Sequence, residues 1–224
     1  GEVIPEIVAP VISKRTGAEK IFTMPTRCPV CGSEVFRSED EAIARCTNAS
    51  CPAQLRRLLA HFVSRNAMDI EGIGEKIAVA LIDIGLVKDA ADLYSLTAEH
   101  LLTMDGIKEK SAANLLNAIS DSKERPLGRL IFALGIRHVG AEIAEILAGH
   151  FGSIEALSRA TGDDLTQITG IGPKIAESIV AFFQNEANRS IIERLKRAGV
   201  ALTERESEQK DLPLKGQQFV LTGT

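Results

Sequence analysis

The sequence predicts a mainly α protein in which a repeated helical unit follows a small cysteine site and a remnant of strand. From Leu55 to about Val200, apolar residues recur at helical spacing, and glycine-containing turns separate short helical segments. Four cysteines cluster between Cys28 and Cys51. The first residues, EVIPEIVAPVI, are rich in Val and Ile and contain two prolines, which fits an edge strand because proline cannot donate to a central ladder.

Composition sets broad limits on function. The 224 residues suffice for one large domain or two small ones. A net charge of −4 excludes a uniformly basic nucleic-acid binder but allows a local basic face. The absence of Trp and the single Tyr argue against binding dominated by aromatic stacking. No apolar run approaches the roughly 20 residues of a membrane-spanning helix, and the N-terminus does not resemble a signal peptide. The glycosylation patterns at Asn48 and Asn188 are interpreted as chance matches.

A short motif occurs four times in the helical region. Each copy contains two positions separated by one residue, and the copies start at positions 72, 106, 138 and 170, which are 34, 32 and 32 residues apart. Such spacing is typical of a repeated supersecondary unit. The paired positions are Gly72/Gly74, Gly106/Lys108, His138/Gly140 and Gly170/Gly172. The shared pattern is apolar-x-Gly-apolar-Gly-x-x-x-Ala-x-x-apolar, which predicts four similar turns between helices.

Each part of the motif has a physical role. The apolar residue two positions before the pair ends one helix and anchors it in the core. The first glycine permits the left-handed backbone of a helix C-cap. The second leaves room where free backbone N–H groups open the next helix, and these groups with the helix dipole form an anion site. In three copies a lysine follows in the first turn, where the dipole disfavours a cation and a phosphate would explain it. These lysines are Lys76, Lys110 and Lys174.

The unit resembles the helix-hairpin-helix motif, which implies contact with the DNA backbone through hairpin amides and without base recognition. We therefore expect DNA contacts at the eight paired positions, at the three lysines and at Arg137. Two copies depart from the pattern. In the third, His138 and Glu142 replace the first glycine and the lysine, so the phosphate contact is either lost or made by a nearby arginine. In the second, Lys108 replaces the second glycine, which weakens the case for close backbone approach. The alternative is that the turns only join helices of a bundle.

The cysteines predict a structural metal site. A Cys-x-x-Cys-Gly turn aims two thiolates at one point, a second pair completes a tetrahedron, and four sulfur ligands leave no open position for catalysis. The expected ligands of one Zn²⁺ are Cys28, Cys31, Cys46 and Cys51. Two disulfides, a redox pair and an iron–sulfur cluster are the alternatives; a redox pair would accompany a βαβ pattern, which is missing here. The next helix carries Arg56, Arg57, His61 and Arg65, which either contact phosphate or form a solvated basic face.

The order of these parts resembles the C-terminal half of bacterial NAD-dependent DNA ligase over essentially all 224 residues. The stretches HFVSRNAMDIEGIGEKI and FALGIRHVG are the most particular to that family. The resemblance implies that residues 1–27 end an OB-fold, 28–54 form a four-cysteine zinc finger, and 55–202 form a four-motif helix-hairpin-helix DNA-binding domain. Residues 203–213 would be a linker and 214–224 the first strand of a truncated BRCT domain.

The same resemblance implies an activity. In this family the lysine of a Lys-x-Asp-Gly motif takes AMP from NAD and passes it to the 5′-phosphate of a nick, and the 3′-OH then displaces AMP. No such motif occurs in this chain, so we expect no catalytic residue here. NAD and Mg²⁺ would serve the full-length enzyme without binding this part. The implied partners are nicked double-stranded DNA, bound independently of sequence, and the upstream adenylation and OB domains. No membrane is implied, and the location is the bacterial cytosol, with the nucleoid.

Two other classes of function remain open at this point. A non-catalytic helix-hairpin-helix scaffold of a repair or recombination complex predicts no strand remnants at the termini. A zinc-dependent protein-interaction module with purely structural hairpins predicts no salt-sensitive DNA binding. A base-excision glycosylase is disfavoured, since such enzymes use one hairpin motif beside a catalytic acid.

Overall fold

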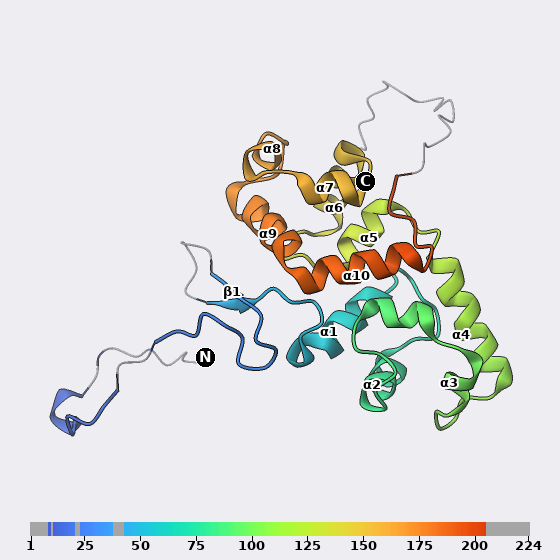
Figure 1. The fold of residues 1–224 in the computed structure, drawn as a ribbon, viewed down its shortest axis with the longest axis horizontal. Coiled ribbons are helices and arrows are strands. Elements are labelled where there is room, and N and C mark those ends of the chain that lie inside the picture. Colours follow the sequence, from blue (N-terminus) through green and yellow to red (C-terminus); the bar gives the residue numbers. More distant parts are fainter. Residues whose placement is uncertain (1–8, 10, 21–22, 38–42, 205–224) are drawn as a thin grey trace, which may run out of the picture.

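The computed structural model describes residues 9, 11–20, 23–37 and 43–204 (Figure 1). The described part of the segment 1–27 contains the 3-10 helix η1 (Ile12–Lys14). The final strand expected at 214–224 and nearly all of the expected linker lie outside the described residues. Within the described residues the fold is mainly α, as predicted, and its sheet has two short strands.

The strands belong to the cysteine segment. Strand β1 (Val35–Phe36) pairs antiparallel with β2 (Arg45–Cys46), with Val35 opposite Cys46. Helix α1 (Pro52–Val63) begins directly after Cys51, with proline in its first turn, a position where a missing N–H costs nothing. The expected boundary after residue 54 therefore falls inside a continuous helix.

Four pairs of helices carry the repeat. Helix α1 packs against α2 (Glu75–Asp83), α3 (Ala98–Leu102) against α4 (Glu109–Ser122), α5 (Leu127–Ala133) against α6 (Ala141–Phe151), and α8 (Gly162–Thr166) against α9 (Pro173–Gln184). The 3-10 helix η2 (Ala90–Ser95) and α7 (Ile154–Arg159) connect pairs. Helix α10 (Glu186–Arg197) crosses the middle of the view in Figure 1 and packs on α9 and η2, so it joins the first half of the repeat to the second.

One apolar core runs through all four pairs, from Leu59 to Val200. The alanine of each repeat is at most 2% exposed, which fits its expected role of letting two helices approach closely. These alanines are Ala78, Ala112, Ala144 and Ala176. The apolar residue three positions further on is also buried in every copy, as Leu81, Leu115, Leu147 and Ile179. The helical spacing of the repeat thus marks the face that each second helix turns to the core.

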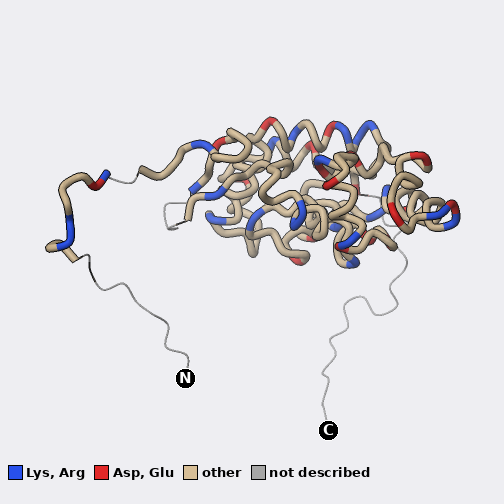
Figure 2. The backbone as a smooth tube through the Cα atoms, turned by 90° about the horizontal axis from the view of Figure 1, so that it is seen from below, with Lys and Arg blue, Asp and Glu red and all other residues tan. Residues whose placement is uncertain are grey.

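The surface mixes both signs of charge. Figure 2 shows Lys and Arg interspersed with Asp and Glu over the helical body, in keeping with the small net charge. Thr203 pairs with Ser153 in an isolated bridge, and the Glu204 amide donates to the Gly152 carbonyl at 2.8 Å. The chain therefore stays bonded to the helical body up to the last described residue. Among the described helices, we find none with the length and apolar character needed to cross a bilayer.

Candidate functional site

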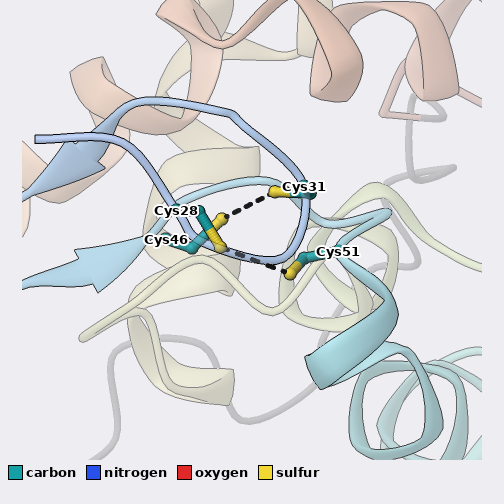
Figure 3. A group of neighbouring side chains, drawn as sticks. All are labelled: Cys28, Cys31, Cys46 and Cys51. Atoms are coloured by element: carbon teal, nitrogen blue, oxygen red, sulfur yellow. Dashed lines mark hydrogen bonds between the residues drawn. The ribbon is translucent and has the colours of Figure 1, made fainter. Parts of the chain in front are cut away.

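The four cysteines converge on one point (Figure 3). Cys28 and Cys31 lie on a tight knuckle, in which the Gly32 amide donates to the Cys28 carbonyl at 2.9 Å and Gly32 has a φ of 71°. Cys46 ends β2, and Cys51 is the N-cap residue of α1. All four Sγ atoms lie within 4.8 Å of one another. The site therefore brings together every metal ligand that the sequence predicts.

The sulfur spacing fits a single tetrahedral ion. Four sulfurs at about 2.3 Å from a zinc ion lie about 3.8 Å apart. The Sγ atoms of Cys31 and Cys46 are 3.4 Å apart and those of Cys28 and Cys51 are 3.9 Å apart. All four cysteines are free, which excludes the two-disulfide alternative. A cluster of several irons would need its thiolates further apart than this cage allows, so a mononuclear site fits better.

Electrostatics also favours a bound cation. Burial raises the pKa of the Cys31 thiol, but hydrogen bonds with Ser33, Cys46 and Cys28 outweigh it and lower that pKa to about 6. The pKa values of Cys46 and Cys51 are raised mainly by burial, and hydrogen bonds with Cys31 and Cys28 and the negative charge of Cys31 raise them further. The thiols thus cannot all ionise together without a positive charge between them. A divalent metal supplies that charge.

The hairpin turns share one backbone geometry, with a carbonyl-to-amide hydrogen bond spanning three residues. In the first copy the Ile73 amide donates to the Ile70 carbonyl at 3.3 Å, and in the fourth the Ile171 amide donates to Ile168 at 3.0 Å. The first position of each pair is the third residue of this turn and has a positive φ. The values are 89° at Gly72, 81° at Gly106, 62° at His138 and 92° at Gly170. The predicted left-handed backbone is confirmed, including at His138.

The predicted helix end is wrong in one respect. We expected the apolar residue before each pair to end the helix and the first glycine to be its C-cap. Instead α1 ends at Val63, well before Ile70, and the other three first helices end two or three residues before the corresponding apolar residue. The left-handed residue belongs to a separate β-turn, whose third position demands a positive φ in the same way. A turn was needed because the chain must reverse before the second helix.

The second position of each pair is the N-cap residue of the second helix. Gly74, Lys108, Gly140 and Gly172 precede α2, α4, α6 and α9, all with extended backbone and all exposed. The first amides of an α-helix have no acceptor within the helix. Each turn therefore presents the positive end of a helix dipole and amides of the first helical turn to the surface. The fourth copy offers fewer amides, because Pro173 has no N–H and the Ile175 amide donates to the Gly172 carbonyl at 3.0 Å. Lys76, Lys110 and Lys174 are exposed in the first turns of α2, α4 and α9, whereas α6 has Glu142 there.

The two glycines of a pair differ in what the fold demands. A Cβ on Gly72 would lie 2.8 Å from Leu115 Cδ2, and its φ is positive, so the fold requires glycine there. A Cβ on Gly74, Gly140 or Gly172 would meet nothing within 4 Å, and the extended backbone at these positions suits any residue. Lys108 occupies the same position in the second copy. Neither packing nor backbone dihedrals therefore require glycine at the second position.

Two of the three arginines near the third hairpin are engaged elsewhere. Arg125 pairs with Asp69, with 2.9 Å between Nη2 and Oδ2, and Arg129 Nε donates to the Ala67 carbonyl at 2.7 Å. Both hold the loop that follows α1. Arg137 is the remaining candidate for a phosphate contact at the third hairpin. Its Nε lies 2.8 Å from His138 Nε2.

Sequence reasoning missed one buried polar residue. Asn188, dismissed above as a chance glycosylation match, has 0% exposure and binds the loop between Cys46 and Cys51. The signal that could have found it is its place on the apolar face of α10, where a lone amide must find partners.

Comparisons with known proteins agree with this geometry. Residues 27–53 match the family described as the NAD-dependent DNA ligase C4 zinc finger domain. Residues 64–121 match the SAM-like helix-hairpin-helix tandem, and residues 129–192 match the helix-hairpin-helix motif.

Curated relatives match along the chain. It is 54% identical over 224 residues to a DNA ligase of Pelotomaculum thermopropionicum, and all of this chain and 33% of the relative are covered. Identity is 51% to a DNA ligase of Halothermothrix orenii and 49% to one of Rubrobacter xylanophilus, with 100% of the chain and 34% and 33% of the relatives covered. The chain thus spans about a third of the length of these relatives. The matched finger and hairpins, with about half of the residues identical along the chain, show that it belongs to the NAD-dependent DNA ligase family.

Proposed function

We propose that this chain is the part of an NAD-dependent DNA ligase that holds duplex DNA around a nick through backbone phosphates. In this proposal, upstream adenylation and OB domains of the same enzyme join the 5′-phosphate to the 3′-OH, and NAD and Mg²⁺ serve that chemistry. The enzyme would work in the bacterial cytosol, on the DNA of the nucleoid. The hairpins would grip the duplex independently of its sequence, because backbone amides and lysines address phosphates rather than base edges.

The observation that carries the proposal is the glycine at the second hairpin position. Neither packing nor backbone conformation requires Gly74 or Gly172. Glycine is an acceptable helix N-cap, but Ser or Asp would cap the helix at least as well, so capping alone does not require glycine. A ligand that approaches the helix amides closely does require the missing side chain. A phosphate fits this description, since it is an anion that accepts hydrogen bonds from several N–H groups.

The proposal assigns residues 55–202 to DNA binding, with contacts at the eight paired positions. The exposed lysines of α2, α4 and α9 lie one turn or less from the free amides and would add charge to the same phosphates. Lys108 would contribute a side chain where the other copies contribute a bare amide, and Arg137 would serve the third copy. The zinc finger at 28–54, with ligands Cys28, Cys31, Cys46 and Cys51, would hold the start of α1 in place.

The test measures binding of this chain to a nicked duplex over a range of salt concentrations. The double variant Gly74→Ala/Gly172→Ala should keep its fold but bind at least about tenfold more weakly, since each blocked contact is a hydrogen bond to a charged acceptor. Gly149→Ala is the matched control, because Gly149 is exposed in α6 and a Cβ there also meets nothing within 4 Å. If the double variant and the control bind equally well, the hairpins are only joints between helices.

A further inference from the structure

A cavity of about 730 Å³ lies where the finger, α1, the third hairpin and α9 meet. Its lining includes Arg45 from β2, Arg57 and His61 from α1, and Arg137 and His138 from the turn before α6. We call it the basic cleft, after these five side chains. Among the described residues that line it there is no Asp or Glu. Three arginines thus gather in one hollow of a protein whose net charge is negative.

Contacts within the protein shape one wall of the cleft. His61 Nε2 is 2.7 Å from the Phe132 carbonyl oxygen, and the two rings pack edge to face with centroids 4.6 Å apart. Leu58 closes in from the same side, since a Cβ on Gly135 would lie 3.2 Å from its Cδ2. These contacts fix α1 against the third hairpin. A ligand entering the cleft would therefore meet a preformed wall, which lowers the ordering cost of binding.

The third hairpin lacks the first-turn lysine of the other copies, so a phosphate bound there would need a positive charge from another element. Its second helix begins with Glu142 where the other copies have lysine, yet its turn has the same left-handed residue and the same exposed N-cap glycine. His138 of that turn lines the basic cleft. A phosphate at this hairpin would thus lie beside the cleft and the arginines of other elements. Arg57 is the exposed member on α1, and its side chain contacts the neutral Gln54, with 3.4 Å between Nη2 and Oε1.

We propose that the basic cleft binds a phosphodiester of the DNA backbone, with Arg57 supplying the charge that the third hairpin lacks. The inference rests on the proposed function, because it takes duplex DNA as the ligand. It adds that the finger, α1 and the third hairpin form one phosphate-binding unit built from separate parts of the chain. The apolar wall formed by Leu58 and Phe132 would face the sugar next to that phosphate.

The neighbouring residue Arg56 provides a matched control. It is exposed like Arg57 but pairs with Asp83, with 2.7 Å between Nη2 and Oδ1, and it does not line the cleft. Arg56→Ala and Arg57→Ala change the net charge equally and lie on the same helix. We would titrate the parent chain and both variants with nicked duplex at several salt concentrations. Arg57→Ala should lower the slope of log affinity against log salt by about one, and Arg56→Ala should leave it unchanged.

Each outcome of these titrations either supports or contradicts the proposed phosphodiester site. Equal slopes for the parent and Arg57→Ala, or equal losses in both variants, would overturn the cleft while leaving hairpin binding intact. If the parent chain fails to bind duplex at low salt, the proposed function and the cleft fall together. A second titration uses AMP as a free mononucleotide. Binding of AMP that depends on Arg57 while the DNA slope does not would also overturn the phosphodiester assignment and indicate a free-nucleotide site.

Discussion

Asn188 of α10 donates a hydrogen bond from Nδ2 to the Thr47 carbonyl at 2.9 Å, although the two residues are 141 positions apart in the chain. Its Oδ1 accepts from the Ala49 amide at 2.8 Å, and Nδ2 also donates to the Phe182 carbonyl at 3.0 Å. The Asn188 side chain thus both donates a hydrogen bond to the loop between Cys46 and Cys51 and accepts one from it. It ties the metal loop to the junction of α9 and α10.

Removing this side chain should destabilise the protein and weaken metal retention. Asn188→Ala leaves the half-buried Ala49 amide and the Thr47 and Phe182 carbonyls without this partner, which costs about 1–3 kcal/mol in the free energy of unfolding. Because the loop that Asn188 holds is flanked by two ligands, the variant should also lose zinc to a chelator at lower concentration. Denaturant unfolding and chelator competition measure the two effects. Asn114→Ala, at an exposed position of α4, is the control and should change neither.

Metal removal should act on the finger, the start of α1 and the α9–α10 junction more than on α2 and α4. Without a cation the thiolates of the finger repel one another, and the 47–50 loop loses its fixed ends. Amide exchange should then speed up in the finger, in the first turn of α1 and around the α9–α10 junction. Helices α2 and α4 should exchange as before, since the described finger loop makes its bonds with α10 and η2 rather than with them. Uniform loss of protection across all helices would contradict this.

Replacement by alanine should destabilise the protein more at Gly72 than at Gly74. Gly72→Ala should lower the free energy of unfolding by about 1–3 kcal/mol, because it forces a left-handed alanine and a contact of 2.8 Å with Leu115. Gly74→Ala should cost less, because its Cβ meets open space and only the poorer N-capping of alanine opposes it. Thermal and denaturant unfolding of the two variants make the comparison. Similar losses in both would mean that the second glycine is also a requirement of the fold.

The first-turn lysines should each contribute one phosphate contact. Lys76→Ala and Lys174→Ala should each lower the salt slope of duplex binding by about one. Glu142→Gln, at the same place in α6, should bind as tightly as the parent or more tightly, because it removes a negative charge. The salt series that tests the cleft serves here too. If both lysine variants keep the salt slope of the parent, the lysines do not contact phosphate. The proposed contacts through backbone amides would remain possible.

The chain alone should not become adenylylated. It contains no Lys-x-Asp-Gly, so incubation with NAD and Mg²⁺ should leave its mass unchanged. A mass increase corresponding to AMP would contradict the assignment of the nucleotidyl transfer to an upstream domain. Addition of the N-terminal part of a related ligase in the same experiment checks that the conditions support adenylylation.

The repeat could be predicted from the sequence because its geometry is local. A positive φ at Gly72 and an N-cap at Gly74 depend on residues within one turn, and the buried Ile73 and Ala78 follow from helical spacing. The metal ligands could also be predicted from the sequence, since a Cys-x-x-Cys knuckle fixes its own local shape. The mainly α class and the ligase family were confirmed on these features.

The features that the sequence did not predict depend on contacts between distant parts of the chain, which no short sequence pattern encodes. The pairing of Arg125 with Asp69 turns a candidate phosphate ligand into a loop clamp, and only the packing of α5 near the end of α1 determines this. The basic cleft combines side chains from residue 45 to residue 138, and its shape depends on how α1 meets the third hairpin. The β-turn between the helices was missed because a glycine C-cap and a β-turn glycine look alike in sequence.

Cys51 is at once a predicted metal ligand and the residue that opens α1, where its carbonyl accepts from the Gln54 and Leu55 amides at 2.8 and 3.0 Å. Four thiolates around one divalent cation form a net anion, and this anion would lie at the positive end of the α1 dipole. The same helix then carries Leu59 and Phe62 into the core. A bound metal would thus stabilise the helix on which the first hairpin is built, and its removal should lower the temperature at which that helix unfolds.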